Sequence, residues 1–249
     1  MKVNFRYLLT ISLVTALGGL LFGFDISVIS GTIPFLQDFF ELNEAMKGWV
    51  VSSALIGCIL GASYSGRLGD YFGRKKVLLA VSVLFGISAI GSGLANSIPT
   101  FITYRILGGI AVGGASVLAP MYIAEVSPAH LRGRMVSLNQ LTIVIGISMA
   151  YFSNYFLLAI GENAWRWMFA AEAVPSLIFF FALFIVPESP RWLVAKNDET
   201  KAHQVLKRVA GTNFADFELS EIKESLSGSE KRGTLREVFK KKYSLIIFL

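Results

Sequence analysis

Four side chains that could do chemistry stand inside otherwise apolar stretches of the chain: Asp25, Arg105, Gln140 and Glu172. A charged side chain at the centre of a bilayer costs about 2.5–3.5 kcal/mol on insertion scales, so it normally faces a partner or a water-filled cavity. An arginine beside an aspartate keeps the carboxylate ionised, and separating the two in a dry interior lets the carboxyl take up a proton. Asp25 and Arg105 therefore predict either a proton site or a static ion pair that fixes helix packing.

The expected depth of the charged residues allows them to meet. Asp25 lies eight residues before Ile33, near the predicted outer end of its helix, and Arg105 lies six residues after Pro99 at the start of its own. Glu172 stands at a similar distance from a third outer end. At 1.5 Å per residue all three lie about 9–12 Å below the outer surface. In one arrangement Asp25 pairs with Arg105; in the other, Glu172 pairs with Arg105 and Asp25 faces water.

Gln140 is an uncharged group in the stretch "SLNQLTIVIGI". Its amide offers two hydrogen-bond donors and an acceptor, which suits a neutral polyhydroxyl ligand better than an ion. The commoner role of such a residue is a hydrogen bond between two helices. The residue alone leaves both interpretations open.

The composition indicates that helices in a membrane position these residues. The chain is 54% hydrophobic and 16% charged with a mean hydropathy of +0.59, whereas soluble domains are about 25% charged. A span needs roughly 17–25 mostly apolar residues, and six stretches qualify: 7–32, 48–67, 77–96, 101–124, 135–160 and 166–186. We therefore predict an all-α membrane protein whose domain 1–186 holds six transmembrane helices.

The basic residues predict the orientation. Eight of them fall in the loops on one side of the predicted spans and two in the loops on the other, so we expect a cytoplasmic N-terminus in the cell membrane. Residues 187–242 then form a cytoplasmic linker with short helices, and 243–249 begin a seventh transmembrane helix that is cut short. Because the basic residues lie between apolar stretches and not on one soluble face, the net charge of +6 does not indicate a nucleic-acid partner.

Smaller patterns predict local features. "ETKAHQVLKRVAG" has apolar residues at helical spacing and stops at Gly211, whereas "SLSGSEKRGT" is typical of a flexible joint. Two small-xxx-small pairs, Gly57 with Gly61 and Gly109 with Gly113, favour close helix packing. Three tryptophans near the predicted outer ends are expected to be interfacial anchors: Trp49, Trp165 and Trp167.

The sequence offers no sign of an enzyme. It has no cluster of metal ligands, no phosphate-binding Walker pattern and no nucleophile elbow. We therefore expect no cofactor, no metal and no ATP-driven pump.

Four motifs together resemble the sugar porter branch of the major facilitator superfamily. They are "GRLGDYFGRKK" from Gly66, "RILGGIAVGG" from Arg105, "PMYIAEVSPAHLRGRMVSLNQL" from Pro120 and "PESPRWL" from Pro187. The first has Tyr71 where the superfamily often has arginine. The motifs cover the chain nearly from end to end, and the resemblance identifies it as similar to the N-terminal half of such a transporter.

The resemblance implies a fold of twelve helices in two six-helix halves, each built from 3+3 inverted repeats. It also implies roles for residues at matching positions. Asp25, paired to Arg105, would carry the coupling proton; Glu172, placed in the same layer by its depth, is added to this predicted proton-coupling set. Substrate-binding residues would be Phe22, Gln140 and Ile147. A cytoplasmic gating network would contain Asp70, Arg74, Glu125, Arg132, Glu188 and Arg191.

The expected function is proton-coupled symport of a monosaccharide of the xylose, glucose, galactose or arabinose type by alternating access. Its partners would be the sugar, protons, the lipid bilayer and a missing C-terminal six-helix half. The alternatives are a facilitative sugar transporter and a membrane sugar sensor that does not transport. Asp25 argues against simple facilitation, because facilitative members of the family commonly lack this acid.

Overall fold

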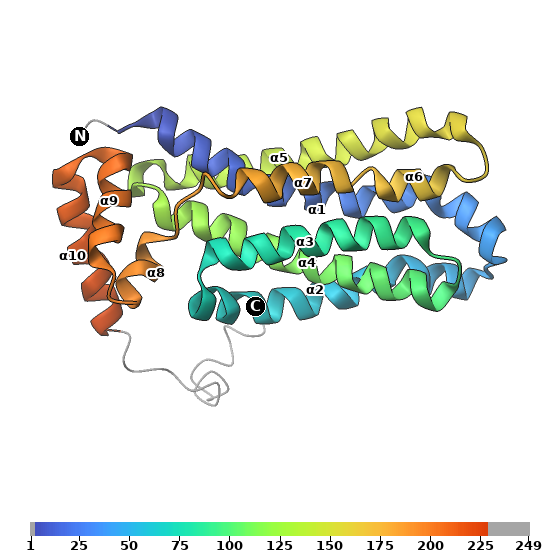
Figure 1. Ribbon diagram of the computed structural model, residues 1–249, viewed down its shortest axis with the longest axis horizontal. Coiled ribbons are helices and arrows are strands. Elements are labelled where there is room, and N and C mark those ends of the chain that lie inside the picture. The colour runs from blue at the N-terminus through green and yellow to red at the C-terminus, as the bar shows by residue number, and fades with distance from the viewer. Residues whose placement is uncertain (1–2, 229–249) are drawn as a thin grey trace, which may run out of the picture.

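The computed structural model describes residues 3–228, and every regular element in that range is a helix (Figure 1). These helices are α1 (Phe5–Phe40), α2 (Glu44–Phe72), α3 (Arg74–Leu94), α4 (Ile98–Val126), α5 (Ala129–Leu157), the 3₁₀ turn η1 (Leu158–Ile160), α6 (Ala164–Ala170), α7 (Ala173–Ala182), α8 (Pro190–Ala195), α9 (Glu199–Ala210) and α10 (Thr212–Gly228). Five of them, α1 to α5, are long and apolar enough to cross a membrane. The predicted all-α class is confirmed, and each of the first five predicted spans overlaps one long helix.

The first helix is longer than predicted. It continues through Pro34 and ends at Phe40, where Glu41 adopts a left-handed conformation. Membrane helices tolerate an internal proline when neighbouring groups satisfy the freed backbone. Asp25 therefore lies fifteen residues before the end of its helix and not eight before an end near Ile33.

The sixth predicted span, 166–186, is not one continuous helix, and its crossing of the membrane stays a prediction. It consists of α6 and α7, which are interrupted at Ala171 and Glu172. Pro175 explains the break, because its ring would clash with the carbonyl four residues earlier, on Ala171, and it has no N–H to donate. The chain makes short turns instead: the N–H of Glu172 bonds to Phe169 O at 3.1 Å and the N–H of Val174 bonds to Ala171 O at 3.2 Å.

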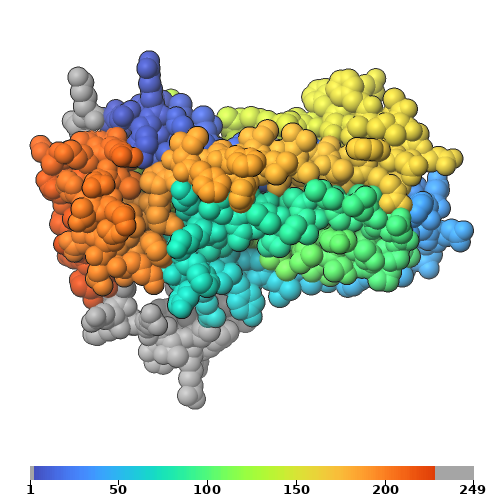
Figure 2. Space-filling model, viewed as in Figure 1, coloured from blue at the N-terminus to red at the C-terminus, as the bar shows by residue number. Residues whose placement is uncertain are grey.

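The spans form one elongated bundle (Figure 1). α1 packs along α5 and α2 along α4, while α3 contacts α4, α6 and α7. On the face seen in Figure 2, α3 and α7 lie side by side, with α1 and α4 behind them in Figure 1. We call the end of the bundle that carries α8, α9 and α10 the linker end, and the opposite one the far end.

An aromatic cluster closes the core at the far end. Trp165 is fully buried, and its ring centroid lies 5.9 Å from that of Phe40 and 6.1 Å from that of Phe101. The prediction that Trp165 is an interfacial anchor was therefore wrong. Trp49 and Trp167, with 46% and 58% of their surface exposed, keep the accessibility that an anchor needs.

Glycines bring α2 and α4 into backbone contact. A Cβ at Gly57 or Gly61 would collide with the backbone of α4, and one at Gly109 or Gly113 would collide with the backbone of α2. Lipid supplies no hydrophobic force between helices, so such close approach is what gives them dispersion contacts. The predicted packing role of both pairs is confirmed.

The helices of the linker form a cap on one end of the bundle. α9 buries the predicted face, Ala202, Val205, Leu206 and Val209, and ends at Gly211 with a φ of +83°. The N–H of Asn4, before α1, bonds to the α9 carbonyl of Val209 at 2.7 Å, which ties the cap to the first span.

The C-terminal part of the linker differs from the prediction. Residues 225–228 of the expected flexible joint belong to α10, so the prediction was wrong for them. Residues 229–234 of the joint, and the seventh helix predicted at 243–249, lie outside the described residues. The division of the chain after residues 186 and 242 stays a prediction.

Candidate functional site

A buried ion pair joins α1 to α4 in the interior of the bundle. The Nη1 of Arg105 donates to Asp25 Oδ1 at 2.6 Å, and the two residues are only 2% and 1% exposed. Gly108, one turn along α4 from Arg105, lets α4 approach α3 at this level, since a Cβ there would collide with Ser88 Oγ, whereas it would lie at an ordinary contact distance of 3.5 Å from Asp25 Oδ1. The structure thus contains the first of the two arrangements that the sequence allowed.

Glu172 is a second buried carboxylate near this pair. It is 1% exposed, stands at the break between α6 and α7, and interacts electrostatically with both Asp25 and Arg105. In the described part of the chain no ion pair within 4 Å joins Glu172 to Arg105. The break therefore lies at the residue, Glu172, that the last span places inside the bundle near the ion pair.

The three residues leave hydrogen-bonding capacity unused. Asp25 Oδ2, Arg105 Nε and Glu172 Oε1 are buried without a partner. Phe169, whose ring centroid is 5.5 Å from the Arg105 guanidinium carbon, screens one side of the cluster. Two carboxylates with one guanidinium would carry a net negative charge if all were ionised, and burial makes that charge costly. The cluster can therefore accommodate one proton.

The predicted substrate residues lie on the helix pair α1 and α5. Gln140 is exposed and Phe22 and Ile147 are half-buried. Backbone contacts set their level: a Cβ at Gly19 would meet Asn139 and Thr142, and one at Gly23 would meet Ile143 and Ile147. Phe22 therefore lies at the same height along the bundle as the segment of α5 that carries the other two. Phe22 also packs against the buried core of the linker-end half.

Sequence reasoning missed the polar residues that hold α5 on α1. Thr142 Oγ1 donates to Ala16 O at 2.6 Å, and Asn154 Nδ2 donates to Val28 O at 3.1 Å. These side chains belong to the buried stripe of α5, which repeats about once per turn: Met135, Asn139, Thr142, Gly146, Ala150 and Asn154. The spacing of its small and polar members could have revealed the stripe. Gln140 stands just outside it, and within the described residues the bonds between α1 and α5 come from Thr142 and Asn154.

Charged residues at the linker end form a connected network. Arg74 Nη2 lies 2.7 Å from Asp70 Oδ1 and 3.0 Å from Glu125 Oε1. The other Glu125 oxygen accepts from the hydroxyl of Ser189, whose own N–H bonds to Glu188 Oε1 at 2.9 Å. Four of the six predicted gating residues are thus linked in one chain of contacts that joins α2, α3, α4 and the start of α8.

A single residue makes the connection between α2 and α3. Gly73 has a φ of +102° and a ψ of 147°, a combination open to glycine but not to residues with a Cβ. The turn directs the N–H of Lys75, in the first turn of α3, to Glu188 Oε1 at 3.1 Å. Trp192 Nε1 in turn donates to Asp70 O at 3.1 Å. The quoted motifs contain Lys75, Ser189 and Trp192, but their spacing alone does not predict these bonds.

The remaining two predicted gating residues, Arg132 and Arg191, line a cavity of about 220 Å³ together with Glu125 and Glu218. Arg132 Nε donates to Ala124 O at 3.1 Å and Arg191 Nη2 donates to Ser225 Oγ at 3.2 Å. Neither guanidinium forms an ion pair within 4 Å among the described residues. The structure thus places them beside the network without joining them to its carboxylates.

Comparison with known proteins identifies relatives along nearly the whole chain. The family model described as "Sugar (and other) transporter" matches residues 11–249. The chain is 42% identical to the D-xylose-proton symporter of Escherichia coli strain K12 over 93% of its length, and 46% identical to the glucose transport protein of Synechocystis sp. over 92%. It is 43% identical to the arabinose-proton symporter of Bacillus subtilis over 94%. These matches cover 54%, 51% and 52% of the relatives, so the chain spans about half their length.

Solved structures show the same relationship in three dimensions. The proton:xylose symporter XylE bound to 6-bromo-6-deoxy-D-glucose superposes with a TM-score of 0.88 at 42% identity, over 92% of this chain and 55% of that one. A partially occluded inward-open conformation of XylE from E. coli gives a TM-score of 0.87 at 40% identity, over 90% of this chain and 60% of that one. The bundle described above is therefore similar to about half of a major facilitator transporter.

Proposed function

Because the chain belongs to the sugar (and other) transporter family, we propose that it is one half of a proton-coupled monosaccharide symporter that works by alternating access. Relatives with 42% and 43% identity are a D-xylose-proton symporter and an arabinose-proton symporter, which supports a sugar of the xylose, arabinose, glucose or galactose type. The complete protein would include a second six-helix half, and the chain would lie in the cell membrane with its N-terminus in the cytoplasm.

The observation that carries the proposal is the buried pair of Asp25 and Arg105. A facilitative transporter needs no acid in this layer, whereas a symporter needs a group that binds a proton in one state and releases it in another. A proton on Asp25 removes the charge that holds Arg105, which frees α1 and α4 to separate. Glu172 offers the guanidinium a second carboxylate, so that Arg105 keeps a counter-ion while Asp25 is protonated.

Coupling follows from different affinities in the two states. A proton or a sugar can shift the conformational equilibrium only by the difference in its binding free energy between the states. Gln140 provides donors and an acceptor for sugar hydroxyls, Phe22 an apolar ring face, and Ile147 an apolar wall at the same level of α5. Sugar and proton would thus act on neighbouring helices, the sugar on α1 and α5 and the proton between α1 and α4.

The linker-end network is proposed as the cytoplasmic gate. Its carboxylates Glu125 and Glu188 bind residues of the same half, while Arg132 and Arg191 remain without an ion-pair partner in the described part of the chain. Guanidinium groups in that position are suited to carboxylates of a second half that closes over this surface. The gate would then close on the cytoplasmic side in one state and open in the other.

The test is the substitution Asp25→Asn in the complete protein, reconstituted into proteoliposomes. Asparagine keeps the size of the side chain but cannot carry a proton, so we expect sugar-induced alkalinisation and concentrative uptake to disappear while sugar exchange at equal concentrations continues. Asp38→Asn is the matched control, because Asp38 is an exposed acid on the same helix, and it should behave as wild type. Undiminished alkalinisation in Asp25→Asn would refute proton coupling through this residue.

A further inference from the structure

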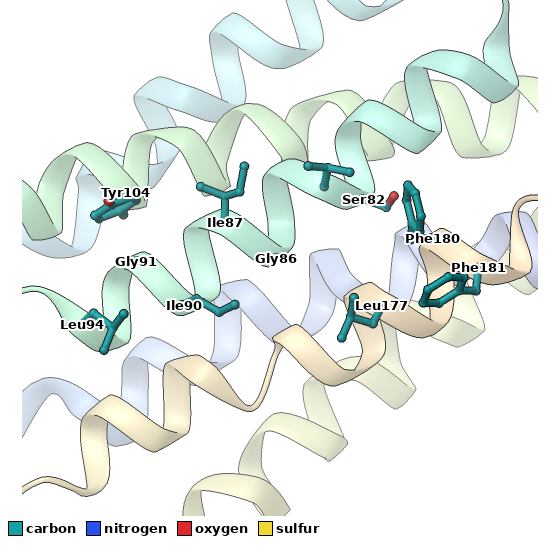
Figure 3. A pocket seen from close by; sticks show the side chains of 11 residues that line it. Ser82, Gly86, Ile87, Ile90, Gly91, Leu94, Tyr104, Leu177, Phe180 and Phe181 are labelled. Atoms are coloured by element: carbon teal, nitrogen blue, oxygen red, sulfur yellow. The ribbon is translucent and has the colours of Figure 1, made fainter.

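An apolar groove runs along the surface of the bundle between α3 and α7. It has a volume of about 500 Å³, and Figure 3 shows it extending from Leu94 and Tyr104 at one end to Ser82, Phe180 and Phe181 at the other. None of the described residues that line it is charged. It is separate from the proton cluster, from the sugar residues on α5 and from the linker-end network.

The floor of the groove offers few polar groups to a ligand. Gly86 and Gly91 let neighbouring helices pack closely on α3, since a Cβ at Gly86 would lie 3.3 Å from Ser176 Oγ and one at Gly91 would collide with the Tyr104 ring. The one serine in the lining has already used its hydroxyl proton, because the Ser82 hydroxyl donates to Leu79 O at 2.7 Å, and its carbonyl accepts from Ser176 Oγ at 2.7 Å. Apart from Ser82 and the hydroxyl of Tyr104, the lining side chains carry no polar atom, so the groove matches a hydrocarbon chain.

The length of the groove matches one leaflet of a bilayer. From Ser82 to Leu94 there are twelve residues of α3, which is about 18 Å of helix. Half of the hydrocarbon core is about 15 Å. The groove therefore begins at the far end of the bundle and stops near its middle, where an acyl chain of that leaflet also ends.

A cation stands at the far-end opening. Arg166 Nη1 donates to Gly93 O at 3.0 Å and to Ala95 O at 2.9 Å, and Nη2 donates to Asn96 Oδ1 at 2.9 Å, directly beside the groove residue Leu94. A guanidinium has five N–H donors, so two remain, and no ion pair within 4 Å uses them among the described residues. A lipid phosphate at that depth would supply the missing acceptor.

We propose that this groove binds one acyl chain of a phospholipid from the leaflet away from the linker end, with the phosphate at Arg166. Water does not reach this depth, and an empty groove would lose dispersion contacts on both of its walls, so hydrocarbon fills it. Shape distinguishes the bound chain from the surrounding lipid: it lies against Ile87 and Ile90 of α3, with the rings of Phe180 and Phe181 at the inner end. The site goes beyond sugar transport and requires only that α3, α4 and α7 lie in the bilayer.

The position of the groove argues against protein as its occupant. The residues proposed to bind sugar are on α1 and α5, so a second half would cover those helices. α3 and α7 form the face in front of them in Figure 1, which is left to lipid. A second copy of the chain is the remaining occupant, and the experiment below distinguishes it.

The experiment uses the complete protein in liposomes that contain phosphatidylethanolamine with a photoreactive diazirine on its acyl chain. Cross-linked residues are identified by mass spectrometry after illumination. We expect the cross-links to concentrate on 82–94 and on the groove side of α7. Ile90→Trp fills the groove from α3 and should reduce them roughly tenfold, the loss expected for about 1.4 kcal/mol of binding free energy.

The matched control is Ile178→Trp, the same substitution on α7 at a residue that does not line the groove. Ile90 and Ile178 are 49% and 56% exposed, so a tryptophan at either position fits the folded protein. If Ile90→Trp does not fold, Leu177→Trp, at a residue 56% exposed, fills the groove from the opposite wall. Ile178→Trp should leave the labelling unchanged. Labelling spread evenly over the exposed face, or equal in all variants, would mean bulk lipid only and would overturn the proposal.

Two further results would also overturn it. Cross-links from groove residues to another copy of the chain, increasing with protein density in the membrane, would assign the groove to a dimer contact. Equal labelling by a diacylglycerol probe with the same acyl chain would remove the phosphate from the proposal, since Arg166 would then contribute nothing.

Discussion

Two neighbouring amide side chains on α5 differ in burial because they lie on different faces of the helix. Asn139 is 8% exposed and lies against Gly19 of α1, whereas Gln140 is exposed. The rotation of about 100° between consecutive residues of a helix is enough to separate a packing role from the ligand-binding role that we propose for Gln140. A similar contrast holds for Asp25, which is buried with a partner, and Asp38, which is exposed on the same helix.

The proposed role of Gln140 gives a prediction at this scale. Gln140→Ala should weaken sugar binding by about 1–3 kcal/mol, because a buried sugar hydroxyl would lose its partner. A calorimetric titration of the complete protein with D-xylose measures the change. Gln204→Ala, the same substitution at an exposed residue of α9, is the control. An affinity equal to wild type for both variants would remove Gln140 from the site.

At the scale of the elements, glycine and proline determine how the helices are placed. Glycine allows the backbones of α2 and α4 to touch, and Pro175 breaks the last span where Glu172 lies near the buried pair of Asp25 and Arg105. Hydropathy and basic loop residues predicted the first five spans well, because a bilayer requires long apolar helices. The same criterion predicted an unbroken sixth span, since an average over many residues does not register one proline.

The contact between α2 and α4 can be tested by a single methyl group. A Cβ at Gly109 would overlap the carbonyl of Ala54, so Gly109→Ala should lower the free energy of unfolding by about 1–3 kcal/mol. Gly48→Ala on α2 is the control, because nothing lies within 4 Å of its Cβ position. Thermal unfolding in detergent compares the melting temperatures of the two variants. Equal values would contradict the prediction, because they would mean that α2 and α4 can move apart without a loss of stability.

At the scale of the whole molecule, a membrane bundle and a water-facing cap meet at the linker end. Glu218 of α10 lies at that junction, in the cavity with Arg132 and Arg191. Burial raises the pKa of the Glu218 carboxyl above its ordinary value; the positive charge of Arg132 partly opposes this and Glu221 adds to it. The protonated carboxyl therefore favours the docked cap.

This shift predicts how the cap responds to pH. The stabilisation from Glu218 is fully present below its unfolded pKa of about 4.3 and is lost as the pH rises through the raised value in the folded protein. Amide hydrogen exchange of α10, corrected for intrinsic rates, should become faster over that range in wild type. Glu218→Gln should remove the dependence, while Glu224→Gln, at an exposed residue of the same helix, should keep it. The same pH profile in all three proteins would contradict the prediction.

The sequence predicted the candidate site unevenly, for physical reasons. Depth allowed Asp25 to pair with Arg105, because a charge inside a bilayer needs a partner, but it left Glu172 open as the alternative partner of Arg105. The structure contains the contact between Asp25 and Arg105 although α1 extends further than predicted. The hydroxyl of Ser189, the indole of Trp192 and the carboxyl of Glu218 could not be foreseen, because they join segments far apart in the chain through tertiary packing. The inverted repeat within this half stays a prediction.

The one-residue joint at Gly73 has a mechanical consequence. Neighbouring Cα atoms are separated by a fixed 3.8 Å, so a single residue between α2 and α3 leaves no slack that could absorb a displacement. Together with the backbone contact between α2 and α4, this short connection makes α2, α3 and α4 one rigid unit. A displacement of the linker end of α2 would therefore move α3 and α4 with it, whereas the break beside Glu172 provides a joint at which the last span can bend.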